Sequence, residues 1–282
     1  MKENKKLDYI AGRVNLAATI FVPFKCGNNC EFCTSKDLYN GFYYSDEAFD
    51  KIMESIDLCN NVTAIKEFVI TGGEPIVNLE DLMLFVEKCH KPVYINTTLP
   101  LITNLDECID YINSENKIRG INISRHIGFT HSVKVAGLEQ INKIKKPVRI
   151  NSIIREDLLG KSLLDFIDYY ATEYRMINLR ADYRTITLDT LKNRDAISTW
   201  LLEHFKMETL SGCMVCNSEF YSDEEYKVIC YHRGLEHSSV EIGGRCYVND
   251  IIIDMYGNIF RDWDMKKDSD FINILTTNSL KL

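Results

Sequence analysis

The sequence contains few of the features that mark a linker, a repeat array or a membrane anchor. Only five prolines stand among its 282 residues, and no internal repeat or low-complexity tract is visible. No run approaches the roughly 18 apolar residues of a membrane span, and the opening segment MKENKKLDYIAGR lacks the apolar stretch of a signal peptide. These absences predict a cytoplasmic, globular chain with no membrane partner.

A surplus of positive charge is absent as well. The formal net charge is −8 at pH 7, and the isoelectric point is near 5.4. A protein that binds nucleic acid electrostatically needs an excess of lysine and arginine, so we expect no nucleic-acid partner. Hydrophobic residues make up 45% of the chain, which is enough to bury the core of one large domain with a small appendage.

What the sequence does contain is an alternation of strand and helix patterns through about its first two thirds. Runs of β-branched and apolar residues predict six strands, at 15–22, 67–71, 92–97, 120–124, 148–154 and 176–180. Apolar residues at helical spacing predict helices at 45–58, 79–89 and 163–174, the first with Ser45 as its N-cap. Strand–helix repeats favour parallel strands joined by right-handed crossovers. The predicted fold is therefore α/β, a partial (β/α)6 TIM-like barrel, whose ligand-binding groups gather at the carboxyl ends of the strands.

The pattern changes after residue 207. The last part of the chain has four cysteines, short β-like segments such as 248–254, and a turn at 255–258. We predict two domains, a (β/α)6 core over residues 1–207 and a small C-terminal cysteine-rich module over residues 208–282.

Ten cysteines in a chain without an export signal are more often metal ligands than disulfide partners. Directly after the first predicted strand, the segment FKCGNNCEFC gives the spacing Cys26-x3-Cys30-x2-Cys33. Thiolates suit iron–sulfur clusters, and a four-iron cluster held at three corners leaves one iron open to an outside ligand. The alternatives are a zinc site or three ordinary core cysteines, but a structural zinc site normally has four protein ligands. We predict that these three thiolates hold a [4Fe-4S] cluster.

This segment resembles the CxxxCxxC signature of the radical S-adenosylmethionine (SAM) superfamily, including an aromatic residue, Phe32, just before the last cysteine. A second motif, ITGGEP, places Gly72, Gly73 and Glu74 immediately after the second predicted strand. Glycines let the backbone approach a ligand closely, and a carboxylate beside them can accept hydrogen bonds from an ammonium group. The resemblance implies that this motif binds the amino group of SAM. It also implies reductive cleavage of SAM to a 5′-deoxyadenosyl radical, with the electron supplied by a flavodoxin- or ferredoxin-type donor.

Polar residues in or after the later strands are further candidates for contact with SAM. Buried polar groups need partners, and a ligand in the barrel could supply them, although internal polar contacts would satisfy them equally well. The candidates are Asn96, Ser124, Arg125 and Asn151. Three arginines at or beyond predicted strand ends, Arg125, Arg155 and Arg180, could hold a carboxylate or a phosphate.

A second cysteine constellation occupies the predicted C-terminal module. Its spacing is Cys213-x2-Cys216-x13-Cys230-x15-Cys246, and a structural zinc site is the general alternative for such a set. The set resembles the auxiliary-cluster modules of radical SAM subfamilies called twitch or SPASM. Its CxxCN start also partly resembles the C-terminal cluster motif of the GTP 3′,8-cyclase of molybdopterin biosynthesis, which has three cysteine ligands. We predict an auxiliary [4Fe-4S] cluster held by all four thiolates, and a three-thiolate cluster without Cys246 stays open as the alternative.

The leading hypothesis is a radical SAM enzyme with one auxiliary cluster that abstracts hydrogen from a small metabolite or a nucleotide-like substrate. Two alternatives stay open. One is an enzyme that matures a short peptide, and the other is a non-catalytic module that binds iron or zinc through the same cysteines. Cys59, Cys89 and Cys108 stand apart on predicted helices, where we expect them to be small buried hydrophobic residues.

Overall fold

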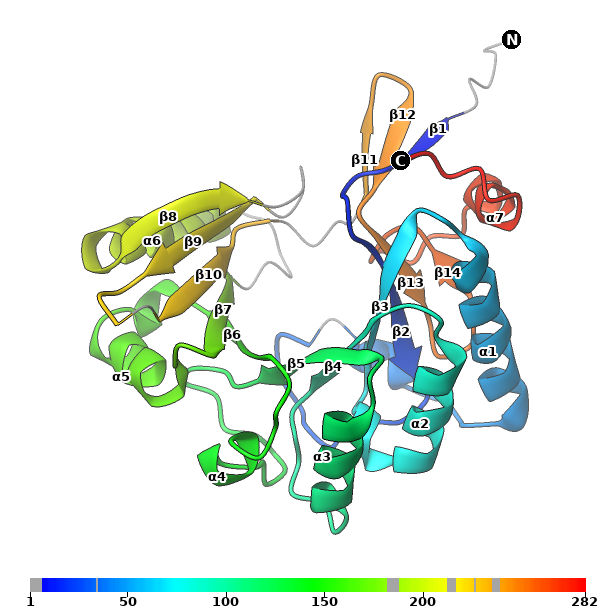
Figure 1. Cartoon of the computed structure of the whole chain (residues 1–282). Coiled ribbons are helices and arrows are strands. Elements are labelled where there is room, and N and C mark those ends of the chain that lie inside the picture. The colour runs from blue at the N-terminus through cyan, green and yellow to red at the C-terminus, as the bar shows by residue number, and fades with distance from the viewer. Residues whose placement is uncertain (1–6, 34, 182–187, 212–216, 226, 235–238) are drawn as a thin grey trace.

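The computed structural model describes residues 7–33, 35–181, 188–211, 217–225, 227–234 and 239–282. All six predicted strands are present, and they pair in parallel in the order of the chain (Figure 1). They are β2 (Leu16–Val22), β3 (Ile65–Gly72), β4 (Val93–Thr97), β5 (Ile118–Ser124), β6 (Val148–Ile154) and β7 (Arg175–Ala181). The predicted mixed α/β architecture with a large parallel sheet is therefore confirmed.

The amino-acid pattern of these strands explains their burial. Every residue of β2 is buried, as expected for a strand with apolar neighbours on both of its faces. In β4 and β6, buried residues, most of them apolar, alternate with half-buried or exposed residues, most of them polar. Successive residues of a strand point to opposite faces, so one face of the sheet packs against helices while the other face carries polar side chains.

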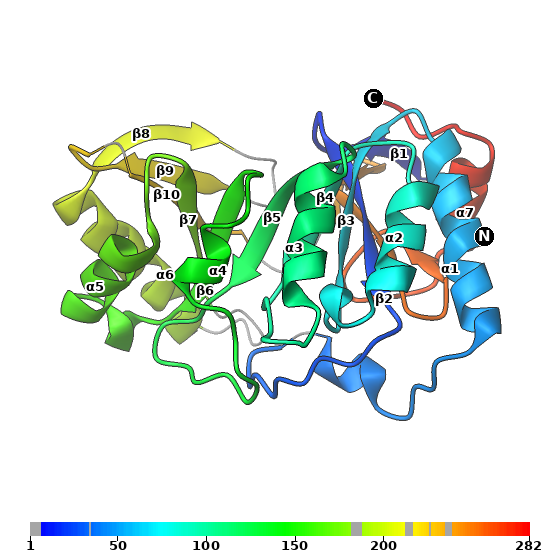
Figure 2. The ribbon, with the colours of Figure 1, turned by 60° about the horizontal axis from the view of Figure 1, so that its bottom comes forward.

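Helices cover the outer face of this sheet. Figures 1 and 2 show α1 (Asp46–Asn61), α2 (Leu79–Lys88) and α3 (Leu105–Ser114) side by side on that face. The predicted N-cap of α1 is confirmed, because the Ser45 hydroxyl accepts a hydrogen bond from the Ala48 N–H at 3.2 Å. The helix predicted at 163–174 is α5 (Lys161–Tyr170).

The segments after residue 207 do not gather into one body, so the predicted C-terminal module is not confirmed. The strands β10 (Val228–His232), β9 (Ser218–Ser222) and β8 (Lys206–Ser211) continue the sheet beyond β7. At the opposite edge, β13 (Asp250–Ile253) pairs with β2 and is followed by β14 (Ile259–Phe260). The eleven-stranded sheet is open, because β14 and β8 stand at its two ends in the part of the chain that the structure describes.

The remaining elements complete the chain. A separate three-stranded sheet contains β1 (Asp8–Ala11), β12 (Arg245–Val248) and β11 (Ser239–Ile242). The other helices are α4 (Leu138–Ile141), α6 (Leu188–His204), α7 (Ser269–Thr276) and the 3-10 turns η1 (Lys36–Tyr39), η2 (Pro75–Val77) and η3 (Glu156–Leu158). Within the described residues, no helix combines the length and the apolar character that a membrane span requires.

The dispersed cysteines are part of the core, as expected. Cys59, Cys89 and Cys108 are fully buried and belong to the main hydrophobic cluster. The Cys108 thiol donates a hydrogen bond to the Ile76 carbonyl at 3.6 Å. None of the three reaches the cavity described below, so they are structural residues.

Candidate active site

A cavity of ≈ 400 Å³ lies at the carboxyl ends of the parallel strands. The loop after β2 contributes all three cysteines of the first motif, and the remaining lining comes from η1, the ends of β3 to β7 and Gly234 after β10. The lining residues include Lys25, Cys26, Cys30, Phe32, Cys33, Lys36, Tyr39, Gly72, Gly73, Asn96, Ser124, His126 and Arg180. The structure thus brings the first cysteine motif and the glycine turn to one cavity.

The cysteine loop holds its thiols in short local turns. The Cys26 sulfur accepts a hydrogen bond from the Asn28 N–H at 3.4 Å, and the Cys33 sulfur lies 3.4 Å from the Ser35 hydroxyl. Burial raises the pKa of the Cys30 thiol to about 11, and the neighbouring thiols of Cys33 and Cys26 add to that shift. Iron binding must therefore displace thiol protons.

Cys26, Cys30 and Cys33 line the same cavity. The ligands of a four-iron cluster bind three different irons, so they line a shared space. That is how Cys26, Cys30 and Cys33 are arranged in the cavity wall.

Neighbouring segments pack so closely on the turn at Gly72 and Gly73 that both positions require glycine. Gly72 has a φ of +103°, and a Cβ added there would lie 2.4 Å from the Tyr39 hydroxyl oxygen. A Cβ on Gly73 would lie 1.5 Å from the Phe24 carbonyl oxygen. The Gly73 N–H donates to the Tyr39 hydroxyl at 2.7 Å, and that hydroxyl donates to the Val22 carbonyl at 2.7 Å. The two glycines therefore let the end of β3 lie directly against the start of the cysteine loop.

Glu74 lies beneath the cavity and is only 2% exposed. Its carboxylate accepts hydrogen bonds from the hydroxyls of Thr97 and Thr98 and, at 2.8 Å, from the Thr98 N–H. Burial raises the pKa of this carboxyl, and the threonine hydrogen bonds oppose the shift. In this structure Glu74 positions the end of β4, and the predicted contact between its carboxylate and SAM stays a prediction.

Arg125 is also turned away from the cavity. Its guanidinium donates to the carbonyls of Thr98 at 2.6 Å, Ser124 at 2.7 Å and Ala136 at 2.7 Å, and the residue is 4% exposed. Thr98 thereby links the Glu74 carboxylate to the Arg125 guanidinium. This buried network fixes the floor of the cavity at the ends of β4 and β5.

The other predicted SAM contacts divide into two groups. Phe32, Asn96 and Ser124 line the cavity, whereas Asn151 does not. The Asn151 side-chain oxygen accepts a hydrogen bond from the Asn178 amide at 3.0 Å. Asn96 lies in a similar ladder, because its side-chain oxygen accepts from the Asn122 amide at 2.6 Å. Internal partners therefore satisfy part of the hydrogen-bonding capacity of both asparagines.

His126, which no sequence motif marks, lies two residues after the end of β5 and lines the cavity. Its Nδ1 accepts a hydrogen bond from the Ile153 N–H at 3.1 Å, so a neutral ring carries its proton on Nε2. Burial lowers the pKa of His126 to about 3. Its ring packs edge-on against Phe32, with ring centroids 4.4 Å apart. The signal that could have found His126 is its place just beyond a predicted strand end.

Cys230 and the first motif share one face of the sheet. On adjacent strands, Ser124 pairs with Asn151, Asn151 with Asn178, and Asn178 with Cys230. Paired residues of neighbouring strands point to the same face, and Ser124 lines the cavity. Cys230 therefore lies on the cavity face. Cys213 and Cys216 lie outside the described residues.

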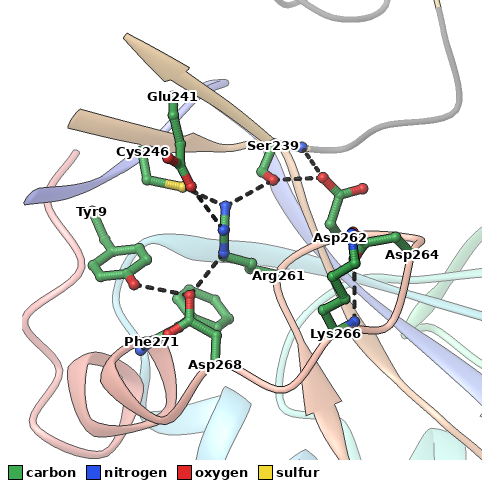
Figure 3. A network of polar contacts seen from close by, with 10 residues as sticks. All are labelled: Tyr9, Ser239, Glu241, Cys246, Arg261, Asp262, Asp264, Lys266, Asp268 and Phe271. Atoms are coloured by element: carbon green, nitrogen blue, oxygen red, sulfur yellow. Dashed lines mark hydrogen bonds and ion pairs between the residues drawn. The ribbon is translucent and has the colours of Figure 1, made fainter. Parts of the chain in front are cut away.

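Cys246 lies elsewhere, in the small sheet, and is fully buried (Figure 3). The Arg261 guanidinium donates to the Cys246 sulfur at 3.0 Å, and it also bonds Asp268 and Glu241, each at 2.8 Å. The Tyr9 hydroxyl donates to the same Asp268 at 2.9 Å. Cys246 is thus enclosed by a network that ties β1, β11 and β12 to the start of α7.

The structure does not bring Cys246 and Cys230 together. Six strands, β2 to β7, separate β10 from β13, which follows β12 after one residue. In Figure 1, β10 and β12 stand on opposite sides of the open sheet. The arrangement gives no support to a single cluster bound by both thiols.

Residues 14–117 match the sequence model of a family described as a 4Fe-4S single cluster domain. No curated protein matches the chain. The chain is similar in structure to a histidine-tagged form of anSMEcpe with bound AdoMet, with a TM-score of 0.47, and to native anSMEcpe with bound AdoMet, with a TM-score of 0.46, each at 15% identity. These alignments cover 67% and 66% of this chain. They cover 58% and 61% of the other two chains, so this chain spans about three fifths of their length. The domain match includes all three cysteines of the first motif and the Gly72–Gly73 turn, and it supports an iron–sulfur cluster at that motif.

Proposed function

We propose that the protein is a radical SAM enzyme that abstracts hydrogen from a small metabolite or a nucleotide-like substrate. The observation that carries the proposal is the shared cavity: the CxxxCxxC thiols and the glycine turn lie in one space at the carboxyl edge of a parallel sheet. When bound and reduced, a [4Fe-4S] cluster with SAM supplies a 5′-deoxyadenosyl radical.

The residues of this chain have definite tasks in such a site. Cys26, Cys30 and Cys33 would hold the cluster, and the glycine backbone would lie beside the methionine part of SAM. Phe32 packs against both His126 and Phe129, with ring centroids 4.4 and 5.3 Å apart, so an aromatic cluster holds the end of the cysteine loop against the segment after β5. The neutral His126 ring offers an Nε2–H donor near Ser124 at the end of β5.

An auxiliary iron–sulfur cluster is part of the proposal. The cavity-facing position of Cys230 supports it, since a cluster there would lie beside the same space as the first motif. The contact between Cys246 and Arg261 favours a set of three thiolates, Cys213, Cys216 and Cys230, over the predicted four. A three-thiolate cluster keeps one iron open, which could bind substrate directly.

Anaerobic reconstitution with iron and sulfide tests the proposal. We expect a reducible cluster whose EPR signal changes when SAM is added, and 5′-deoxyadenosine after addition of dithionite. The variant Cys108→Ala is the matched control, because this cysteine is buried on α3 and should leave both results unchanged. Zinc in place of iron, together with no SAM cleavage, would instead identify a non-catalytic metal-binding module.

A further inference from the structure

The order of the strand ends divides the cavity into two walls. The cysteine loop follows β2 and the glycine turn ends β3, so the cluster and the methionine part of SAM belong to this wall. Arg180 stands at the end of β7. Four strand spacings of about 4.8 Å separate β3 from β7 along the sheet. The β7 wall is therefore the part of the cavity left for a second ligand.

Among the Lys, Arg, Asp and Glu side chains of the described residues, those that line the cavity are all cationic. Lys25, Lys36 and Arg180 line it, and no aspartate or glutamate is among its described lining residues. The chain as a whole has a net charge of −8, so this local balance departs from that of the molecule. Lys25 and Lys36 flank the cysteine loop and lie beside the thiolates of the first motif. Arg180 places the third cation on the opposite wall.

The three arginines that the sequence suggests for anion binding have different surroundings in the structure. Arg125 is buried and donates to three backbone carbonyls. Arg155 lies beyond β6 and makes a two-point ion pair with Asp157, at 3.0 and 2.9 Å. Only Arg180 among the three lines the cavity.

An asparagine pair lies on the same face of the sheet as Arg180, below the residues that line the cavity. Asn178 precedes Arg180 by two residues on β7, so both side chains face the cavity side of the sheet. Its amide donates to the Asn151 oxygen at 3.0 Å, which leaves the Asn178 oxygen and the Asn151 amide as further hydrogen-bonding groups. A guanidinium above an amide pair suits a polar ligand that carries an oxyanion.

We propose that Arg180 binds a carboxylate or phosphate group of the substrate, with Asn178 and Asn151 beneath it. The inference rests on the proposed function, because it takes the bound anion to be part of that enzyme's substrate. The binding of an anion at Arg180 does not itself depend on the reaction. A guanidinium can bind either oxyanion through two parallel hydrogen bonds, which fixes the orientation of the bound group. The substrate is therefore an acidic molecule held at β7 with its remainder directed toward SAM.

Binding of two simple anions tests the inference. Inorganic phosphate and succinate are titrated by calorimetry into the anaerobically reconstituted protein in the presence of SAM, and the tighter of the two identifies the oxyanion. Arg180→Gln should weaken that binding about tenfold or more, the loss expected for a charge-assisted pair, while SAM affinity stays unchanged. Arg155→Gln is the matched control and should change neither.

Three results would overturn the inference. They are binding of neither anion by the wild-type protein, equal anion binding by Arg180→Gln, and weaker SAM binding by Arg180→Gln, which would place the carboxylate of SAM itself at Arg180. Failure of the proposed function is a separate result, namely absence of 5′-deoxyadenosine, because anion binding can be scored without any turnover.

Discussion

The two cysteine constellations are built in opposite ways. Cys26, Cys30 and Cys33 belong to a single loop, and one strand end, that of β2, positions all three. Cys230 and Cys246 come from strands of two different sheets on opposite sides of the molecule (Figure 1). A ligand set within one loop depends on local sequence, whereas a set drawn from distant strands depends on how those strands pair. Spacing along the chain is therefore informative about the first set and uninformative about the second.

The largest expected effect tests the local set. Cys30→Ala should abolish SAM cleavage and remove about four irons per chain, because a [4Fe-4S] cluster held by three thiolates does not tolerate the loss of one. Iron analysis and detection of 5′-deoxyadenosine measure both losses. Retained cleavage in this variant would remove the cysteine loop from the mechanism.

The next effect tests the dispersed set by comparing two variants. Cys230→Ser should remove the iron of the auxiliary cluster and keep the SAM-dependent EPR signal of the first. Cys246→Ser should keep all of the iron and lower the free energy of unfolding by about 1 kcal/mol, since it weakens one partly buried hydrogen bond to Arg261. Iron loss in Cys246→Ser would restore the four-thiolate set and show that the network in Figure 3 rearranges when the cluster binds.

A smaller effect distinguishes two possible roles of Glu74 beside the glycine turn, namely positioning β4 and binding SAM directly. Glu74→Gln should lower the free energy of unfolding by about 1–3 kcal/mol, because a buried amide nitrogen would then face the donors of Thr97 and Thr98. Thr98→Val removes the hydrogen bond that the Thr98 hydroxyl donates to the Glu74 carboxylate and changes no charge. It should also lower the free energy of unfolding.

SAM affinity then decides the role of the Glu74 carboxylate. If Glu74 only positions β4, both variants should alter SAM affinity to a similar, small extent. A loss of affinity confined to Glu74→Gln would mean that the carboxylate contacts SAM. Calorimetric titration of SAM into the two reconstituted variants, with urea unfolding of the same preparations, supplies both measurements.

The same contrast between local and distant contacts explains how far the sequence predicts the fold. The six strands of the parallel sheet were predictable because each is a continuous apolar or alternating run. The docking of β10 beside β7 and of β13 beside β2 was not, because no local pattern states which sheet edge a short strand will join.

The direction in which a side chain points limits the prediction of site residues from sequence in a similar way. The sequence places Arg125 and His126 together at the end of a predicted strand, and either could have entered the cavity. The structure turns Arg125 inward to three carbonyls and leaves His126 at the cavity. The deciding contacts come from Thr98 and Ala136 for Arg125 and from Ile153 for His126, which belong to other segments of the chain. Only the assembled sheet brings these partners together.

The last expected effect is a slope and concerns the pH dependence of stability around the cysteine loop. Burial lowers the pKa of His126 to about 3 in the folded chain, against 6.5 for an ordinary histidine. Between these values the unfolded chain binds a proton that the folded chain does not. With respect to this histidine, the free energy of unfolding is therefore highest above pH 6.5. It falls by about 1.4 kcal/mol per pH unit as the pH drops from 6.5 toward 3.

His126→Phe keeps an aromatic ring beside Phe32 and removes the titrating group. We expect urea unfolding of the apo chain, under anaerobic reducing conditions, to show a shallower loss of stability below pH 6.5 than in the wild-type protein. The variant also lacks the acceptor for the Ile153 N–H, which lowers its stability by a similar amount at every pH and leaves the slope as the diagnostic quantity. His90→Phe is the control, because His90 is exposed at the end of α2 and its ring is not removed from water. Equal slopes in His126→Phe and the wild-type protein would show that the His126 ring is hydrated in solution, and the aromatic cluster around Phe32 would then be open to water.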